Sequence, residues 1–419
     1  MTETVWNVDV SSTFLIENAE TPDAGEMPKF QTMEKSLDRK LTRILADRSC
    51  NDFILADAKD ADMAYGLSAP GQSPEHYAQE GAFRTLDQYR EQIREVIRQG
   101  LVDIVLMSVN TNDLLTIRER LFANSSITPA IRANDATDIW LAGAEGVYGK
   151  EPSRPFRTAD LDHAMCGKLN CTKEERKLGA DLGLYSVTYN NNMERDYQTL
   201  LAYNEFRKEA ELKGFRHFLE VFSPNACEPN APKDIPKFVN DHIVRTLAGV
   251  AEAGRPVFLK IPYYGPKAME ALVRYDSNVV VGILGGGAGT TFDAFKMLAD
   301  AKKYGARVAL YGRKINSAEH QTTFIHYLRA IADGQIGPAE ATKAYHGDLQ
   351  KLKISPRRKL EDDLAETETA VSYSGGGTGK KKSLNTVTVS MSDGQPDFKK
   401  MSQSEKVQWN LERLKRIFG

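Results

Sequence analysis

Residues 279–314 contain two strand-and-glycine units that decide the fold class. The first reads Val279-Val-Val-Gly-Ile-Leu-Gly-Gly-Gly-Ala-Gly-Thr-Thr291, and the second reads Val308-Ala-Leu-Tyr-Gly-Arg-Lys314. In each unit a short apolar run ends in glycine, and the first unit leads directly into a helical pattern that continues to Tyr304. An apolar, β-branched run followed by a helical pattern is typical of a parallel strand and its crossover helix.

The same kind of run recurs eight times along the chain, which is the number of strands in a TIM (β/α)8 barrel. The runs are Phe53–Asp57, Val102–Met107, Ala130–Ala133, Leu184–Tyr189, Phe218–Phe222, Val257–Ile261, Val279–Leu284 and Val308–Tyr311. Helical patterns separate them at Leu86–Gln99, Glu194–Lys213, Phe238–Ala253, Lys267–Tyr275 and Thr291–Tyr304. Glycines that end helices stand at Gly100, Gly214, Gly254 and Gly305. We therefore expect an α/β fold of the TIM-barrel type.

Composition excludes several classes of protein. The 419 residues carry 55 Lys and Arg against 57 Asp and Glu, so the chain lacks the basic excess of a nucleic-acid binder. No apolar run approaches the roughly 18 residues that a membrane span needs, and the first 20 residues are polar and acidic. Four scattered cysteines suggest reduced, mostly buried thiols. We expect a cytoplasmic protein with no nucleic-acid or membrane partner.

Four segments are expected along the chain: an N-terminal extension (1–40), the barrel (41–360), a linker (361–401) and a C-terminal helix (402–419). The barrel segment ends in helical runs near Phe324–Asp333 and Pro338–Lys351, and the linker is rich in Ser, Thr and Gly. The last helix would place Val407, Leu411, Leu414 and Phe418 on one face. It is expected to dock on its own barrel or on a sister subunit, or to recruit a larger assembly.

Two connections are longer than a simple strand-to-helix unit requires, residues 66–83 and 134–177. In a barrel both would lie on the C-terminal face, where loops build the active site. We expect them to shape substrate choice or a subunit contact.

A lysine interrupts the sixth apolar run, Phe258-Leu-Lys260-Ile-Pro262. A barrel strand is covered on both faces, and desolvation favours the neutral amine, which can attack a carbonyl and form a Schiff base. The alternative is a lysine that pairs with a carboxylate at the strand end. Glu220 occupies the equivalent position in the fifth run, so it is expected beside Lys260 as a proton shuttle or as its counter-ion.

The first strand ends with further charged residues, Asp57-Ala-Lys59-Asp60-Ala-Asp62. Because side chains alternate along a strand, Asp57 and Lys59 should point the same way, and one of them should line the mouth of the barrel. A metal site at Asp57, Asp60 and Asp62 is a weaker interpretation, since the spacing fits no calcium loop. We expect no metal site.

Glycine-rich loops follow the seventh and eighth strands. In TIM barrels these loops often hold a phosphate on backbone N–H groups, and glycine lets the anion approach closely. The expected phosphate ligands are Gly285, Gly286, Gly287, Gly289, Gly312 and Arg313. Tight turns also need glycine, but the second unit, with its arginine, favours a phosphorylated substrate.

Taken together, residues 50–335 resemble the class I aldolases of the deoxyribose-phosphate, tagatose-bisphosphate and archaeal-type fructose-bisphosphate kinds. The resemblance rests on Gly282 to Arg313, on Leu259-Lys260-Ile-Pro-Tyr-Tyr-Gly265 and on Phe218-Leu-Glu220-Val-Phe-Ser223. It implies a lyase of sugar-phosphate metabolism in which Lys260 forms the Schiff base and Glu220 moves the proton. Asp57, Tyr189 or Tyr264 would assist, and Lys59 is the alternative nucleophile. It implies no cofactor, and we expect a homo-oligomer.

Two alternatives remain open on the same scaffold. A Schiff-base transferase or thiolase-type enzyme would use the same lysine. A barrel without activity would instead serve as an assembly component through its C-terminal helix.

Overall fold

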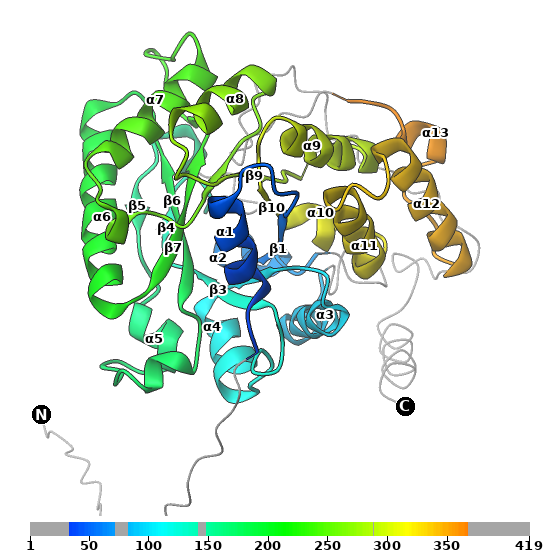
Figure 1. Cartoon of the computed structure of the whole chain (residues 1–419), viewed down its shortest axis with the longest axis horizontal. Coiled ribbons are helices and arrows are strands. Elements are labelled where there is room, and N and C mark those ends of the chain that lie inside the picture. The colour runs from blue at the N-terminus through cyan, green and yellow to red at the C-terminus, as the bar shows by residue number, and fades with distance from the viewer. Residues whose placement is uncertain (1–32, 72–82, 141–147, 288, 368–419) are drawn as a thin grey trace, which may run out of the picture. The chain divides into compact units, whose positions relative to one another are not determined.

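Eight parallel strands form a closed barrel (Figure 1). The computed structural model describes residues 33–71, 83–140, 148–287 and 289–367. Around the barrel the strand order is β1-β10-β9-β8-β7-β6-β3-β2. The strands are β1 (Ile54–Lys59), β2 (Ile104–Met107), β3 (Thr128–Arg132), β6 (Leu182–Thr188), β7 (Arg216–Phe222), β8 (Leu259–Ile261), β9 (Val281–Leu284) and β10 (Val308–Tyr311). The predicted TIM barrel is confirmed, and each predicted run overlaps one strand.

Helices surround the barrel, with α6 and α7 on the left of Figure 1 and α11 and α12 on the right. The long helices are α3 (Leu86–Gln99), α6 (Met193–Lys213), α7 (Ile235–Ala248), α8 (Pro266–Tyr275), α9 (Thr291–Lys303), α11 (Gln321–Ala332) and α12 (Pro338–Lys351). Gly100 and Gly214 end α3 and α6 in the left-handed conformation, as predicted. The predicted helix Phe238–Ala253 is wrong at its end. The chain leaves α7 at Gly249, and Gly254 belongs to a separate short turn, η5 (Glu252–Gly254).

The amino-terminal end of the barrel is closed by α1 (Ser36–Ala46). One face of this helix is buried in the apolar cluster that fills the lower lumen. The cluster contains Leu37, Leu41 and Ile44 of α1, the strand residues Ile54, Ile104, Phe218 and Val308, and Phe258 directly before β8. Asp38 of α1 also pairs with Arg216 at the start of β7, with 2.5 Å between the charged atoms. The predicted boundary at residue 40 therefore falls within a helix that packs against the barrel.

The connections after the first three strands contain short elements. After β1 come α2 (Asp62–Tyr65) and η1 (Gly66–Ser68), and after β2 come α4 (Val109–Asn112) and the π-helical η2 (Asp113–Arg118). The long third connection contains β4 (Asp135–Ala136), η3 (Tyr148–Lys150), β5 (Pro155–Phe156), α5 (Leu161–Cys166) and η4 (Glu175–Lys177). β4 and β5 form a separate antiparallel pair. The parts of these loops at 72–82 and 141–147 lie outside the described residues.

The expectation of four reduced thiols is wrong for Cys166 and Cys171, which form a disulfide. Gly167, at φ 80°, turns the chain back on itself after α5. The turn leaves the two Cα atoms 6.1 Å apart, a distance that a disulfide spans. Cys50 and Cys227 are free and only half-buried.

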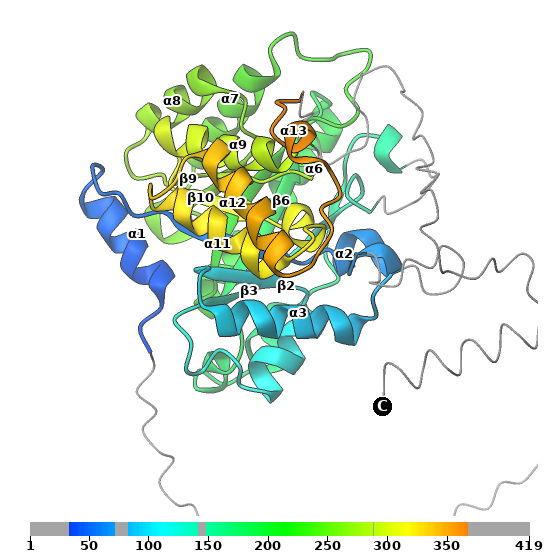
Figure 2. The ribbon, with the colours of Figure 1, turned by 90° about the vertical axis from the view of Figure 1, so that its right-hand side faces the viewer.

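At the carboxyl-terminal side, α11 and α12 pack against α9 and against each other (Figure 2). After α12 the chain passes through α13 (Leu360–Asp363) and returns to the start of α9. There Thr290 Oγ1 donates to the carbonyl of Ala365 at 3.0 Å, and Thr367 Oγ1 donates to Asp293 at 2.5 Å. The predicted linker thus begins in a segment packed on the barrel. Residues 368–401 and the predicted helix 402–419 lie outside the described residues and stay predictions.

No helix among the described residues is long and apolar enough to cross a membrane.

Candidate active site

The side chains of each barrel strand alternate between the lumen and the layer of surrounding helices. Phe218 of β7 and Phe258, directly before β8, stack in the lower lumen, with ring centroids 4.5 Å apart. Two residues further along each strand, on the same side, stand Glu220 and Lys260. The predicted pair therefore lies in the lumen, one layer nearer the C-terminal ends of the strands.

Glu220 and Lys260 are register partners on adjacent strands, and only 2.6 Å separates Oε1 from Nζ. Their side chains are 0% and 4% exposed. This short, buried ion pair places a carboxylate, a potential proton acceptor, directly beside the lysine amine.

Three further polar residues complete the site. Sequence reasoning missed Arg132 and Ser186, and it named Asp60 only as a possible metal ligand. Arg132 of β3 donates to Asp60 Oδ2 at 2.7 Å and to Ser186 Oγ of β6 at 2.9 Å. Ser186 in turn donates to Glu220 Oε2 at 2.8 Å, and the Arg132 guanidinium lies 3.9 Å from the same oxygen. Two cations and two carboxylates are thus joined across the lumen. We call Asp60, Arg132, Ser186, Glu220 and Lys260 the lumen network.

A signal for Arg132 was present in the sequence. Arg132 is a charged residue inside an apolar run, as Lys260 is, and it follows the lumen residue Ala130 by two positions. Strand alternation alone would have placed it in the lumen. Ser186 gave a weaker signal, because a serine in a strand is common.

The expectation that Asp57 or Lys59 lines the mouth is wrong. Both point away from the lumen, because Ala56 and Ala58 occupy the lumen side of β1. Lys59 Nζ donates to Gln321 Oε1 at 3.2 Å and to Asn316, and lies 3.3 Å from Asp57 Oδ2. Asn316 and Gln321 belong to the surrounding helices α10 (Arg313–Asn316) and α11. Burial raises the pKa of the Asp57 carboxyl to about 6, although the Lys59 ammonium opposes that shift.

The two candidate tyrosines each have a hydroxyl partner outside the lumen network. Tyr189 points outward, where its hydroxyl is 2.7 Å from Thr246 Oγ1 of α7. Tyr264 packs against the outer apolar layer, and its hydroxyl is 2.6 Å from Ser223 Oγ in the loop after β7. Burial raises the pKa of both phenols to about 12. Assistance by either tyrosine in proton transfer stays a prediction.

The glycine loops pack tightly against β10 and β1. A Cβ added to Gly285 would lie 2.2 Å from the Tyr311 ring, and one added to Gly312 would lie 2.7 Å from the Ala58 carbonyl. Gly286 and Gly289 have φ angles of 60° and 82°, which favour glycine. The glycines therefore have structural reasons to be there, and phosphate binding by them stays a prediction.

Arg313, at the start of α10 (Arg313–Asn316), lies beside the first glycine loop. A Cβ on Gly287 would come within 2.9 Å of Arg313 Nε, and the Arg313 guanidinium lies over the Tyr65 ring, 6.0 Å from its centroid. The first amide of α9 is already taken, because Thr291 N–H donates to Asp363 Oδ1 at 2.8 Å. Any phosphate here would depend on the loops and Arg313 rather than on that amide.

An apolar cluster lies above the lumen network. Phe222 follows Glu220 on the lumen side of β7, and Leu284 follows Gly282, the register partner of Lys260. The two side chains cluster with Ala64 of the first loop and with Ala136 and Ile139 of the third. Under this cover the whole Lys260 residue, backbone included, is only 3% exposed. Charges in so dry a site interact strongly.

The metal interpretation finds no support in the described ranges. No group of three or more His, Cys, Asp or Glu side chains in them could hold a metal ion. Asp60 instead pairs with Arg132, and Asp57 faces the helices.

No protein-family model and no curated protein sequence matches the chain. Among solved structures, it is similar to one described as an archaeal fructose 1,6-bisphosphate aldolase, with 18% identity and a TM-score of 0.50 over 71% of this chain and 100% of that one. It is also similar to a fructose-bisphosphate aldolase from Slackia heliotrinireducens, with 14% identity and a TM-score of 0.51 over 74% of this chain and 89% of that one. At these identities the likeness establishes the barrel fold.

Proposed function

We propose that this protein is a class I aldolase that makes or breaks a carbon–carbon bond of a phosphorylated ketose through a Schiff base at Lys260. The observation that carries the proposal is the contact between Lys260 and Glu220, buried in the lumen near the C-terminal ends of the strands. TIM-barrel enzymes have their active sites at that end. The similar barrels are described as fructose-bisphosphate aldolases, which agrees with this choice.

The reaction would begin when Lys260 passes a proton to Glu220. The neutral amine attacks the ketone carbonyl, and Glu220 returns its proton to the carbinolamine hydroxyl, which leaves as water and gives an iminium. Glu220 then takes the proton of the substrate hydroxyl beside the bond to be cleaved. The carbon–carbon bond breaks to release an aldehyde, and the electron pair of that bond moves into the iminium to give an enamine. Glu220 supplies the proton that converts the enamine back to an iminium, and water then releases the ketone product.

The rest of the lumen network would keep Glu220 in place during these steps. Ser186 donates to Oε2, which leaves Oε1 directed at Lys260. Arg132 stabilises the carboxylate charge, and Asp60 balances Arg132. Arg313 and the glycine loops would hold the substrate phosphate.

Borohydride trapping tests the proposal, because borohydride reduces an iminium to a stable amine. Full-length protein would be treated with borohydride and a panel of ketose phosphates, including dihydroxyacetone phosphate, and the modified peptide mapped by mass spectrometry. We expect added mass on Lys260, lost in Lys260→Met and kept in the control Lys267→Met, which removes an exposed lysine of α8.

The other results separate the alternatives. An adduct on Lys260 without release of an aldehyde would favour a Schiff-base transferase. An adduct on Lys59 would move the nucleophile outside the lumen. Absence of any adduct with the whole panel would favour a barrel without this activity.

A further inference from the structure

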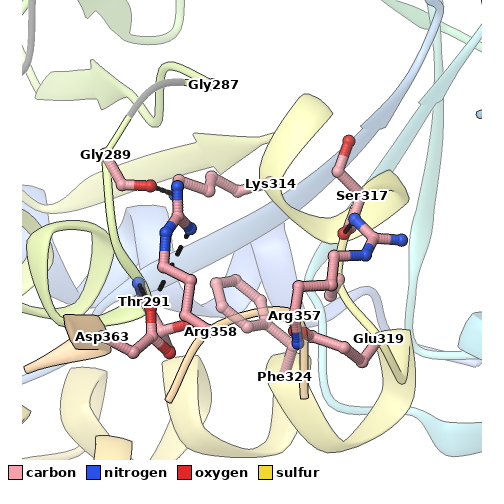
Figure 3. Close-up of a pocket in the computed structure, with 11 residues that line it drawn as sticks. Gly287, Gly289, Thr291, Lys314, Ser317, Glu319, Phe324, Arg357, Arg358 and Asp363 are labelled. Atoms are coloured by element: carbon pink, nitrogen blue, oxygen red, sulfur yellow. Dashed lines mark hydrogen bonds and ion pairs between the residues drawn. The ribbon is translucent and has the colours of Figure 1, made fainter. Parts of the chain in front are cut away.

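A cavity of about 380 Å³ borders Gly287 and Gly289, so it adjoins the glycine loops of the candidate active site (Figure 3). The outer face of α6 is a separate feature, because no member of the lumen network lies on this helix. α6 covers the left side of the barrel in Figure 1. Its inner face is buried through Thr199, Tyr203, Phe206 and Ala210.

The outer face of α6 is also apolar. Among the described residues, sixteen large apolar side chains are exposed, and five of them belong to this one helix. The five are Met193, Tyr197, Leu200, Leu201 and Leu212. Met193 and Leu212 are 88% and 85% exposed. Single exposed apolar residues are ordinary, whereas a group of them on one surface is typical of an interaction site.

Charged and polar groups on this outer face are arranged symmetrically about Leu201. Tyr197 lies four residues before Leu201, and Glu205 lies four residues after it. Glu194 lies seven residues before Leu201, and Lys208 lies seven residues after it. Residues at these spacings share one side of an α-helix, and all five are exposed. We call these five residues the α6 stripe.

The α6 stripe is complementary to itself when two copies of the helix lie antiparallel. A two-fold axis beside Leu201 would bring each Glu194 opposite the partner's Lys208, since both lie about 10.5 Å from Leu201 along the helix. Each Tyr197 hydroxyl would face the partner's Glu205, which can accept its hydrogen bond. The two copies of Leu201 would pack against each other at the centre.

The same arrangement would cover the two most exposed apolar side chains of α6. Met193 lies eight residues before Leu201, and Leu212 lies eleven residues after it. In the antiparallel pair, Met193 would therefore lie within one helical turn of the partner's Leu212 at each end of the contact.

We infer that the α6 stripe is the contact surface of a homodimer, in which α6 packs antiparallel against α6 of a second copy of this chain. The occupant is a second copy because opposite charges stand at equal distances from a central leucine. A two-fold contact requires that symmetry, and an unrelated partner does not. Each copy would keep a complete lumen network, because none of its members lies on α6.

Analytical ultracentrifugation of the full-length protein over a range of concentrations measures the association. Glu194→Lys places like charges opposite each other at both ends of the stripe, and so does Lys208→Glu. Each variant alone should dimerise at least about tenfold more weakly than the wild type. An equimolar mixture of the two variants should associate again, because opposite charges then face each other in the mixed dimer.

Leu201→Glu should also weaken association at least about tenfold, because it places two carboxylates beside the two-fold axis. Its matched control is Leu352→Glu, which should associate like the wild type. Leu352 follows α12, outside the stripe, and is 48% exposed against 47% for Leu201. All these substitutions change exposed side chains, so the variants should fold.

Three results would overturn the inference. The wild type would stay monomeric at every concentration, Leu201→Glu would associate like Leu352→Glu, or the mixture of charge variants would associate no better than its components. None of these results depends on an adduct at Lys260, so the proposed function is tested separately.

Discussion

Arg132 and Asp60 form an ion pair inside the barrel, with 2.7 Å between Nη1 and Oδ2. The pair spans β2, because Arg132 belongs to β3 and Asp60 directly follows β1. Removal of one member of a buried pair leaves the other charge uncompensated and typically costs about 3–5 kcal/mol. Removal of Arg132 should also destabilise Glu220, because that carboxylate would lose its second neighbouring cation.

We therefore expect Arg132→Ala to lower the free energy of unfolding by about 3–5 kcal/mol, measured by urea denaturation. Arg132→Lys, which keeps the charge, should lose much less. The double variant Asp60→Ala/Arg132→Ala should be more stable than Arg132→Ala alone, because it leaves one fewer unpaired carboxylate. Equal stability of Arg132→Ala and the wild type would mean that the pair is not buried in solution.

Ser186→Ala should slow the reaction without removing the nucleophile. A hydrogen bond to a charged group contributes about 1.5–3 kcal/mol, so the rate of adduct formation at Lys260 should fall roughly ten- to a hundredfold. Thr188→Ala is the matched control, because Thr188 lies on the same strand and its hydroxyl donates to Asp138 instead. If the two variants react at the same rate, Ser186 does not orient Glu220.

The outward-facing Asp57 predicts a specific dependence of stability on pH. Its folded pKa of about 6 is above the ordinary value of 3.8, so the folded state holds this proton after the unfolded state has lost it. As pH rises from about 4 to 6, the wild type should lose up to about 3 kcal/mol of unfolding free energy relative to its value at low pH. Asp57→Asn should lack that part of the pH slope.

The two proteins should be compared by the slope of unfolding free energy against pH, since the substitution also removes the carboxylate that faces Lys59. Urea denaturation at a series of pH values measures these slopes. Parallel slopes for the two proteins would contradict the raised pKa. Because Asp57 faces the helices, Asp57→Asn should still form the adduct at Lys260.

Arg313→Ala should impair use of a phosphorylated substrate. Loss of a charge-assisted contact worth roughly 1.5–3 kcal/mol would raise KM about ten- to a hundredfold, while an unphosphorylated analogue should be little affected. Gly287→Ala should act in the same direction but more weakly, because its Cβ would push against the Arg313 side chain. Equal losses with both substrates would mean that Arg313 is structural.

Prolonged treatment with EDTA should leave activity intact, since the iminium serves as the electron sink in the proposed reaction. Steady-state rates before and after treatment measure this. Loss of activity that zinc or magnesium restores would indicate metal-dependent chemistry instead.

Sequence periodicity was sufficient for the barrel but not for the direction of every side chain. The apolar runs located all eight strands, because each strand is buried on both faces. For the same reason they could not tell which face of β1 lies inward, and Asp57 and Lys59 were assigned to the wrong side. Phe218 and Phe258, two positions before Glu220 and Lys260, lie in the lumen. Only the tertiary structure shows that this side of the two strands faces inward.

Other features of the site depend on contacts between distant segments. The glycines after β9 suggested an anion at the start of α9, but Asp363, from beyond α12, already occupies the first amide. Likewise the cover over Lys260 combines residues from the first and third loops with Phe222 and Leu284. No local sequence pattern predicts contacts between segments so far apart in the chain.

The helix that closes the lower end of the barrel has a consequence for biosynthesis. α1 leaves the ribosome before the strands of the barrel, but its partners include Phe218, Phe258 and Val308 from the second half of the chain. Its apolar face can be fully covered only after β10 has been made and has paired with β1. Contacts between such distant segments form slowly, and exposed apolar surface invites aggregation in the meantime. Nascent chains that stall before β10 should therefore depend on chaperones until the last strand emerges.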